Sequence, residues 1–273
     1  MSDGKFIDVN GVKIHYHDVG EGKPVILIHG GGPGAGGLSN YRRNMDAIAK
    51  RARALVIDLP GYGQSENKRA PGGIFVTLAE MIVGFMDALG LDKADFIGNS
   101  LGGGTALMMA LRYPDRVGKM VLMGTAGGLP MFSPFPTEGL VRMFTFYDGD
   151  GPSIEKLRKV LELLIFDQSA ITQELLEERL KAATRPDVIS NPPLRAVVDI
   201  HLSDEMWRER MPAHETLLVW GRDDRVVPLD AAFILLKTMP NAQLHVFPKC
   251  GHWAQWEKAD AFNDLVCDFL ELR

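Results

Sequence analysis

One short stretch, Gly98 to Gly102, constrains the fold of this chain more than any other, because it reads Gly-Asn-Ser-Leu-Gly. The residues just before it, Ala94 to Ile97, have a strand-like pattern, and the small and apolar residues after it favour a helix. A serine at the apex of such a turn has a strained backbone, and glycines on both sides relieve crowding. The pattern predicts that Ser100 presents its hydroxyl as a nucleophile, with the Leu101 amide at the helix N-terminus to stabilise negative charge. The alternative is that this five-residue pattern occurs here by chance.

The composition excludes several classes of protein. The chain has 273 residues, of which 46% are hydrophobic and 24% charged, as is usual for a globular protein with a sizeable core. A net charge of -5 argues against a nucleic-acid partner. No apolar run approaches a membrane span and the first residues do not resemble a signal peptide, so we expect a cytoplasmic protein. Cys250 and Cys267 lack metal-ligand spacing and are expected to be free thiols.

Strand and helix patterns alternate along the first part of the chain. Asn10-Gly11 separates two strand patterns and predicts an opening hairpin of residues 6–9 and 12–17. Further strands are predicted at 24–28, 54–58, 94–97 and 119–123, with helices at 39–49, 78–89 and 103–111. Thr77 to Glu80 has the form of a capping box at the start of the second helix. The alternation predicts an α/β fold with a mostly parallel sheet flanked by helices.

A glycine-rich loop, His29 to Gly37, follows the strand at 24–28. A phosphate-binding loop would be followed by Gly-Lys-Ser/Thr and a dinucleotide-binding loop by an acid for the ribose, and neither can be placed here. We therefore expect a loop that brings a backbone amide to a substrate oxygen, with Gly31 as the donor. Asp58 is expected to form a turn. His15 and His17 share a strand face but lack a third metal ligand, so we expect them on the surface.

The regular alternation ends after Thr125, where glycines and prolines mark a boundary. Helical patterns follow at 154–165, at 173–183 and around Trp207, and no strand pattern returns before Thr216. We therefore divide the chain into an α/β core of residues 1–130 and 213–273 and an inserted helical cap of residues 131–212. Its larger apolar side chains are expected to pack, some of them toward an apolar substrate: Met131, Phe132, Phe135, Met143, Phe144 and Phe146.

An acid and a histidine follow the last two predicted strands, at 216–220 and 243–247. Asp224 and His252, preceded in the chain by Ser100, give the order Ser, Asp, His that marks the α/β-hydrolase fold. His252 is expected to take the proton of Ser100, and Asp224 to orient His252. Taken singly, Asp224 can be a turn residue and His252 a loop residue, and Asp223 is a rival acid.

Five motifs together resemble those of the meta-cleavage product hydrolases, which act in bacterial degradation of aromatic compounds. They are His29–Gly37 with Ser39-Asn40, Gly98–Gly102, Phe166–Ser169, Trp220–Arg225 and His252–Trp256. The resemblance covers nearly the whole chain and favours Asp224 over Asp223. It implies hydrolysis of a carbon-carbon bond in a 2-hydroxy-6-oxohexa-2,4-dienoate, giving 2-hydroxypenta-2,4-dienoate and a carboxylic acid. It also suggests a homo-oligomer, and no metal or organic cofactor is indicated.

The same resemblance implies that Arg179 binds the carboxylate of this small anionic dienoate. It also implies that four residues line the polar side of the site: Gly32, Asn40, Asn99 and Trp253. A guanidinium can hold a carboxylate in a bidentate pair. In a helix the residues three and four positions before and after Arg179 are apolar. The alternative is therefore that the aliphatic part of the Arg179 side chain covers apolar surface. Candidates for the apolar subsite are Leu164, Trp207, Val226 and Val227.

The implied chemistry has two stages, conversion of the dienol to its keto form and then attack on the C6 carbonyl. We expect Ser100 to form an acyl-enzyme, and direct attack by a water that His252 activates is the alternative. A second hypothesis keeps the triad but makes the protein a carboxylesterase of small esters. A third is a ligand-binding protein without catalysis, which the triad argues against. Dehalogenases and epoxide hydrolases of this fold place an aspartate where Ser100 stands.

Overall fold

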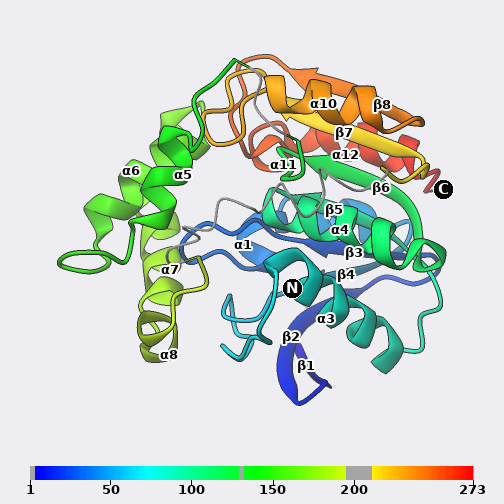
Figure 1. Cartoon of the computed structure of the whole chain (residues 1–273), viewed down its shortest axis with the longest axis horizontal. Helices are drawn as coiled ribbons and strands as arrows, with labels where there is room; N and C mark the ends of the chain where they lie inside the picture. The colour runs from blue at the N-terminus through cyan, green and yellow to red at the C-terminus, as the bar shows by residue number, and fades with distance from the viewer. Residues whose placement is uncertain (1–3, 129–131, 195–210, 273) are drawn as a thin grey trace.

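A sheet of eight strands runs through the computed structural model, which describes residues 4–128, 132–194 and 211–272 (Figure 1). The strands are β1 (Lys5–Val9), β2 (Val12–Val19), β3 (Pro24–Ile28), β4 (Arg53–Ile57), β5 (Ala94–Asn99), β6 (Val117–Met123), β7 (Thr216–Gly221) and β8 (Ala242–Phe247). Their order is β1-β2-β4-β3-β5-β6-β7-β8. The hairpin β1-β2 and the pair β2-β4 are antiparallel, and all other pairs are parallel. The predicted α/β fold with a mostly parallel sheet is confirmed.

Helices cover both faces of the sheet, as a strand with a continuous apolar sequence requires. On β3, Ile26 and Ile28 join one core cluster and Val25 and Leu27 the other, because successive side chains point to opposite faces. The first cluster includes side chains of α3 (Ile74–Ala88), α4 (Leu101–Arg112) and α10 (Asp230–Thr238). The second includes side chains of α1 (Gly37–Tyr41), α2 (Met45–Ala49) and α12 (Ala259–Phe269). None of the helices in the described ranges is long and apolar enough to cross a bilayer.

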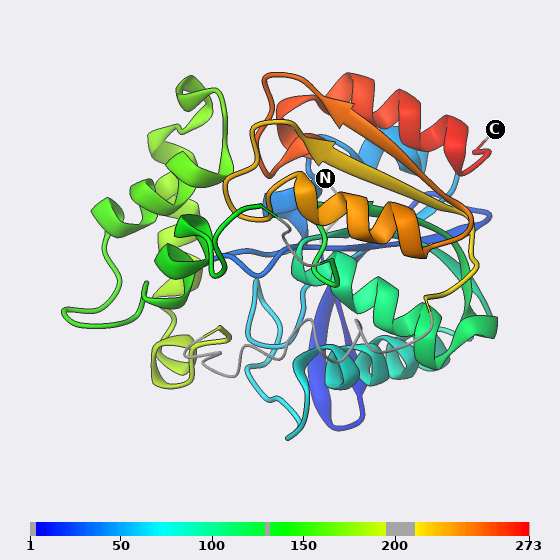
Figure 2. The same cartoon turned by 45° about the horizontal axis from the view of Figure 1, so that its top comes forward.

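Between β6 and β7, the described residues form an insertion with four α-helices: α5 (Glu138–Phe144), α6 (Ile154–Leu164), α7 (Gln173–Ala183) and α8 (Pro186–Ser190). They lie beside one end of the sheet rather than on its faces (Figures 1 and 2, green). Each of the first three begins with a Ser or Thr side chain that accepts a backbone N–H, at Thr137, Ser153 and Thr172. The proposed boundaries 1–130, 131–212 and 213–273 stay a prediction, and Met131 and Trp207 lie outside the described residues.

Two predicted helix boundaries were wrong. The predicted helix at 39–49 is two short helices, because Asn44 between them turns its side chain inward to donate to Gln255 O and Asn263 Oδ1. The predicted capping box at Thr77 does not exist, since α3 already begins at Ile74. Thr77 Oγ1 instead donates to the carbonyl of Ile74 inside the helix. Burial of Phe75, a tertiary contact, extends the helix before the predicted cap.

The expectation that His15 and His17 lie on the surface was also wrong, since they are only 2% and 5% exposed. Nδ1 of His15 lies 2.7 Å from Oδ2 of Asp58, which is itself buried. Asp58 does more than form a turn. Its carboxylate also accepts hydrogen bonds from the amides of Gly37 and Gln64, at 2.6 and 2.8 Å. One buried carboxylate therefore ties the hairpin to the C-terminal end of the glycine-rich loop.

Candidate active site

The turn at Ser100 has the strained geometry that the sequence predicts. β5 ends at Asn99, α4 begins at Leu101, and Ser100 between them has φ 53° and ψ -111°. A positive φ in a residue other than glycine is uncommon and marks strain at functional sites. A Cβ on Gly98 would lie 2.5 Å from the carbonyl oxygen of Gly102, and one on Gly102 would lie 2.1 Å from that of Ile28. Only glycine fits at these two positions.

His252 and Asp224 form a buried pair beside this turn. Nδ1 of His252 lies 2.7 Å from Oδ2 of Asp224, while Oδ1 of Asp224 accepts from the amides of Val226 and Val227 at 2.8 and 3.0 Å. A hydrogen bond from Nδ1–H to the carboxylate leaves the lone pair of Nε2 free to accept a proton. Nε2 is buried and has no hydrogen-bond partner within the described part of the chain. The rival acid, Asp223, accepts instead from the amide of Cys250.

A narrow polar pocket brings together residues from distant parts of the chain. Its empty volume is about 220 Å³, and its lining is Gly30, Gly31, Gly32, Ala35, Asn40, Asn99, Ser100, Met143, Leu164, Arg179, His252 and Trp253. Ser100 is only 9% exposed, so its hydroxyl faces this cavity rather than open solvent. The cavity lies at the carboxyl ends of β3 and β5, where parallel sheets place their ligands.

Arg179 supplies the positive charge of the polar pocket. Its side chain is fully buried, and Nε and Nη2 donate to the carbonyl oxygen of Pro33 at 3.1 and 2.7 Å. The guanidinium lies over the ring of Trp253, with its carbon 4.7 Å from the ring centroid. Burial lowers the pKa of Arg179 to about 10, so the group is still charged at neutral pH. Nη1 has no hydrogen-bond partner in ranges 4–128, 132–194 and 211–272.

The neighbouring acid, Glu178, acts on this charge only from a distance, because its carboxylate forms an ion pair with Arg42. A buried charge without a carboxylate is costly and favours binding of an anion. The alternative, in which the Arg179 side chain only covers apolar surface, does not explain why Nη1 is buried without a hydrogen-bond partner among the described residues.

The two asparagines of the polar pocket hold the loops around it. Asn40 accepts from the amide of Gly30 and donates to the carbonyl of Gly36, each at 3.3 Å. Asn99 donates to the carbonyl oxygens of Met123 and His252, at 3.3 and 3.4 Å. Its Oδ1 is buried and has no partner among the residues that the structure describes, so it remains free to accept from a ligand.

The glycine-rich loop is held from both ends. Nε2 of His29 accepts from the amide of Leu59 at 2.9 Å, and burial lowers the pKa of His29, which keeps the ring neutral. The hydroxyl of Tyr62 donates to the carbonyl of Gly31 at 3.0 Å. A Cβ on Gly32 would lie 3.1 Å from Nη2 of Arg179, so this residue has to be small for the guanidinium to approach the loop.

An apolar pocket opens on the other side of Ser100. Its empty volume is about 730 Å³, and it shares Gly31, Ser100 and Met143 with the polar pocket. Its other lining residues are Phe75, Leu101, Ala126, Gly127, Gly128, Phe135, Leu140, Phe144, Leu194, Val226, Val227 and Pro228. No charged side chain lies among these described residues. Ser100 therefore stands between a polar pocket with a free cation and a larger apolar pocket.

The predictions for the apolar residues hold in part. Phe135, Met143, Phe144, Val226 and Val227 line the apolar pocket, and Phe146 packs in the core of the insertion as expected. Leu164 lines the polar pocket rather than the apolar one, and Phe132 is 86% exposed instead of packed. The sequence did not indicate that Phe75, Leu140 and Leu194 line a pocket. Phe75 reads as an ordinary apolar residue of an amphipathic helix, and no local signal distinguishes a side chain that faces a pocket from one that faces the core.

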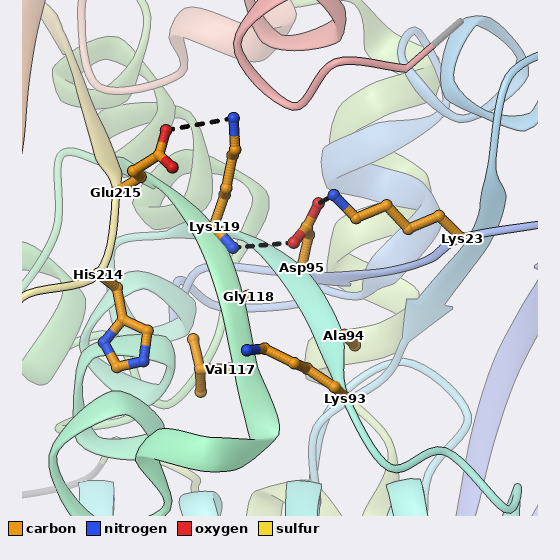
Figure 3. A pocket seen from close by; sticks show the side chains of 9 residues that line it. All are labelled: Lys23, Lys93, Ala94, Asp95, Val117, Gly118, Lys119, His214 and Glu215. Atoms are coloured by element: carbon orange, nitrogen blue, oxygen red, sulfur yellow. Dashed lines mark hydrogen bonds and ion pairs between the residues drawn. The ribbon is translucent and has the colours of Figure 1, made fainter.

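A third cavity lies at the opposite end of the sheet, where β5, β6 and β7 begin (Figure 3). Asp95 accepts from the amide of Lys119 at 2.8 Å and pairs with Nζ of Lys23 at 2.5 Å. Lys119 pairs with Glu215 at 3.2 Å. Because the amino ends of parallel strands are not where such sheets bind ligands, we do not place the functional site here.

Comparison with known proteins agrees with this architecture. The family described as alpha/beta hydrolase fold matches residues 23–259. The chain is 46% identical to 2-hydroxy-6-oxo-6-phenylhexa-2,4-dienoate hydrolase of Burkholderia cepacia, over 97% of this chain and 96% of that one. It is 45% identical to 2-hydroxy-6-oxononadienedioate/2-hydroxy-6-oxononatrienedioate hydrolase of Comamonas testosteroni, over the same shares.

A solved structure is similar over almost the whole length. The meta-cleavage product hydrolase of Pseudomonas fluorescens IP01, CumD, superposes with a TM-score of 0.85 at 38% identity, covering 98% of this chain and 97% of that one. The insertion and the sheet are therefore both shared with this structure.

Proposed function

This chain belongs to the meta-cleavage product hydrolases of the α/β-hydrolase family, and we propose that its reaction takes place at Ser100, between the two pockets. The enzyme hydrolyses a carbon-carbon bond of a 2-hydroxy-6-oxohexa-2,4-dienoate and releases 2-hydroxypenta-2,4-dienoate and a carboxylic acid. The observation that carries the assignment of the site is the buried guanidinium of Arg179, whose Nη1 lacks a hydrogen-bond partner among the described residues, in the pocket that Ser100 and His252 also line. A general esterase has no need of such a cation.

We assign the dienoate end of the substrate to the polar pocket. The carboxylate would accept from Nη1 of Arg179, the group that lacks a partner among the described residues. Trp253 and Gly32 hold the guanidinium and the loop in position. The free Oδ1 of Asn99 can accept from the 2-hydroxyl group.

We assign the C6 substituent to the apolar pocket. The relatives differ at this position, since one is named for a 6-phenyl substrate and another for a dioate with a second carboxylate. No cation is found among the described residues of the apolar pocket, and burial of an unpaired carboxylate is costly. The preferred substrate therefore has an uncharged, apolar C6 substituent.

The chemistry follows from these positions. After the substrate has taken its keto form, Oγ of Ser100 attacks C6 and its proton passes to Nε2 of His252, which Asp224 orients. The amides of Gly31 and Leu101 donate to the oxyanion. The C5-C6 bond then breaks, its electron pair stays on the dienoate fragment, and this fragment takes the proton from His252. Water hydrolyses the remaining acyl-enzyme and releases the carboxylic acid.

The alternative route is direct attack on C6 by a water that His252 activates. Rapid quenching during turnover, followed by mass spectrometry of the peptide that contains Ser100, distinguishes the two routes. We expect an acyl adduct on Ser100. Its absence under conditions where product has formed in a single turnover would favour the direct attack.

The test of the function is the decay of dienolate absorbance with three substrates: the 6-phenyl and 6-methyl 2-hydroxy-6-oxohexa-2,4-dienoates and 2-hydroxy-6-oxononadienedioate. We expect fast decay with the first two, slow decay with the third, and none with Ser100→Ala. An activated ester is the control. Turnover of the ester alone would contradict the carbon-carbon hydrolase and leave the carboxylesterase.

We also propose that the enzyme is a cytoplasmic homo-oligomer. The family resemblance supports the oligomer, and two buried free thiols, Cys250 and Cys267, are consistent with a reducing compartment. Size-exclusion chromatography with light scattering would test the oligomer, since a single mass near 30.1 kDa at micromolar concentration would contradict it.

A further inference from the structure

The carboxylate of Glu257 connects two parts of the chain that lie far apart in the sequence. Glu257 is the last residue of α11 (Ala254–Glu257). Its Oε2 accepts from the amides of Phe166 and Asp167, at 2.8 and 3.2 Å, just after helix α6 of the insertion. Its Oε1 accepts from the amide of Gly251, at 2.8 Å, in the loop that carries His252. One carboxylate therefore receives three backbone hydrogen bonds from two separate segments.

The same two segments also touch directly. The amide of His252 donates to the carbonyl oxygen of Leu164, the last residue of α6, at 2.8 Å. A Cβ on Gly251 would lie 2.7 Å from that oxygen and 3.1 Å from the amide nitrogen of Phe166. The backbone that carries His252 thus lies against the C-terminal end of α6, with no room for a side chain between them.

We propose that Glu257 is a positioning residue that fixes the loop of His252 to the insertion, so that the insertion sets the position of Nε2 relative to Ser100. This inference rests on the proposed function of His252 as the base. Glu257 lines neither of the two pockets at Ser100, so we expect it not to contact the substrate. Its effect reaches the chemistry through Gly251 and the Leu164-His252 hydrogen bond.

The surroundings of Glu257 favour this role over an ordinary surface salt bridge. Burial raises the pKa of Glu257, and the three backbone hydrogen bonds and Lys258 partly offset that effect. Sγ of Cys250 is its other neighbour, at 3.9 Å, while the carboxylate of Asp167 turns away to Ser169. The carboxylate oxygens of Glu257 therefore accept hydrogen bonds from backbone amides of both segments.

The test compares Glu257→Gln with Glu162→Gln, which removes the same charge from an exposed position on α6. The side-chain amide that Glu257→Gln introduces can accept on one side only, since its NH₂ group would face an N–H on the other. Misplacement of a catalytic group by about 1 Å can cost on the order of a hundredfold in rate. We expect kcat with the 6-phenyl dienoate to fall at least tenfold in Glu257→Gln, KM to change less than threefold, and Glu162→Gln to match the wild type.

A second readout does not depend on the dienoate. The rate at which a serine-directed phosphonate labels Ser100 depends on the base, so it should fall in parallel with kcat. If the wild type turns over no dienoate, the proposed function fails while the labelling rates still test Glu257. Labelling and kcat within twofold of the wild type, or a loss confined to KM, would overturn the positioning role.

Gly251→Ala provides an independent variant should Glu257→Gln not fold. The added methyl group would lie 2.7 Å from the carbonyl oxygen of Leu164 and 3.2 Å from Oε1 of Glu257, so it would push the loop of His252 away from both. We expect the same signature, a lower kcat and slower labelling with nearly unchanged KM. Wild-type rates in a folded Gly251→Ala protein would overturn the inference.

Discussion

Arg179 and Pro33, 146 residues apart, are joined by two hydrogen bonds from one guanidinium to one carbonyl oxygen. This pairing fixes the only positive charge of the polar pocket, among the residues described, against the glycine-rich loop. It uses Nε and Nη2 and leaves Nη1 without a partner among those residues. The insertion thus contributes a cation, and the sheet domain contributes the carbonyl that orients it.

Replacing Arg179 should affect the dienoate and not a neutral ester. A hydrogen-bonded charge pair that loses one partner costs roughly 2–5 kcal/mol, so we expect kcat/KM of Arg179→Gln toward the 6-phenyl dienoate to fall by about a hundredfold. Steady-state kinetics with the dienoate and with a 4-nitrophenyl ester measure this selectivity. Arg158→Gln, at an exposed position on α6, is the control. Equal losses toward both substrates would mean that Arg179 has a structural role only.

Asp224 and Asp223 offer a matched pair of substitutions. Asp224→Asn keeps the shape but reverses the preference of His252 Nδ1 for its proton, so we expect kcat to fall by about 10⁴-fold. Asp223→Asn should retain kcat within about threefold, since Asp223 does not contact His252 in the structure. A larger loss in Asp223→Asn than in Asp224→Asn would contradict the assignment of the acid.

A cation introduced into the apolar pocket should change the substrate preference. Leu140 lines that pocket, while its neighbour Val141 is 42% exposed. We expect Leu140→Arg to raise the ratio of kcat/KM for 2-hydroxy-6-oxononadienedioate over the 6-phenyl substrate by at least about tenfold, because the second carboxylate then has a partner. Val141→Arg should leave the ratio unchanged. An unchanged ratio in Leu140→Arg would place the C6 substituent elsewhere.

Asp58 should stabilise the fold in a pH-dependent way. Burial alone would raise the pKa of Asp58, but hydrogen bonds from His15 and from the amides of Gln64 and Gly37 hold it below its usual value. A carboxyl whose pKa is depressed by folding contributes stability above its unfolded pKa of about 3.9, and this contribution is lost as the pH falls through the folded pKa.

We therefore expect Asp58→Asn to lower the free energy of unfolding by about 3 kcal/mol at pH 7, with a smaller difference from the wild type below pH 4. Urea unfolding of both proteins between pH 3 and pH 7 measures this. A difference that is constant over this range would mean that the charge of Asp58 is not what stabilises the loop.

The local elements were predictable because their signals are local. The turn at Ser100 follows from glycines at 98 and 102, and the hairpin follows from Asn10-Gly11. The helix predicted at 173–183 has those bounds, with Thr172 as its cap. Where a boundary depended on distant residues the prediction was wrong, as at Thr77, because the burial of Phe75 extends α3 toward its N-terminus.

Some residues of the candidate site were likewise predictable from the sequence and others were not. Ser100, Asp224 and His252 are visible in the sequence because each follows a strand, and the family resemblance pointed to Arg179. The pairing of His15 with Asp58 was missed, since a buried histidine and an exposed one look alike in a strand pattern. The role proposed for Glu257 left no trace at all, because its partners are backbone amides, which every residue carries.

By itself the sequence determined the strands of the sheet, the strained turn and the three candidate catalytic residues, because periodicity and backbone sterics act between neighbours in the chain. Only the tertiary structure decided that Asp224 rather than Asp223 contacts His252, that Arg179 is buried with Nη1 lacking a partner among the described residues, and that one pocket is polar and the other apolar. These properties depend on contacts between segments far apart in the chain, so no local sequence pattern predicts them.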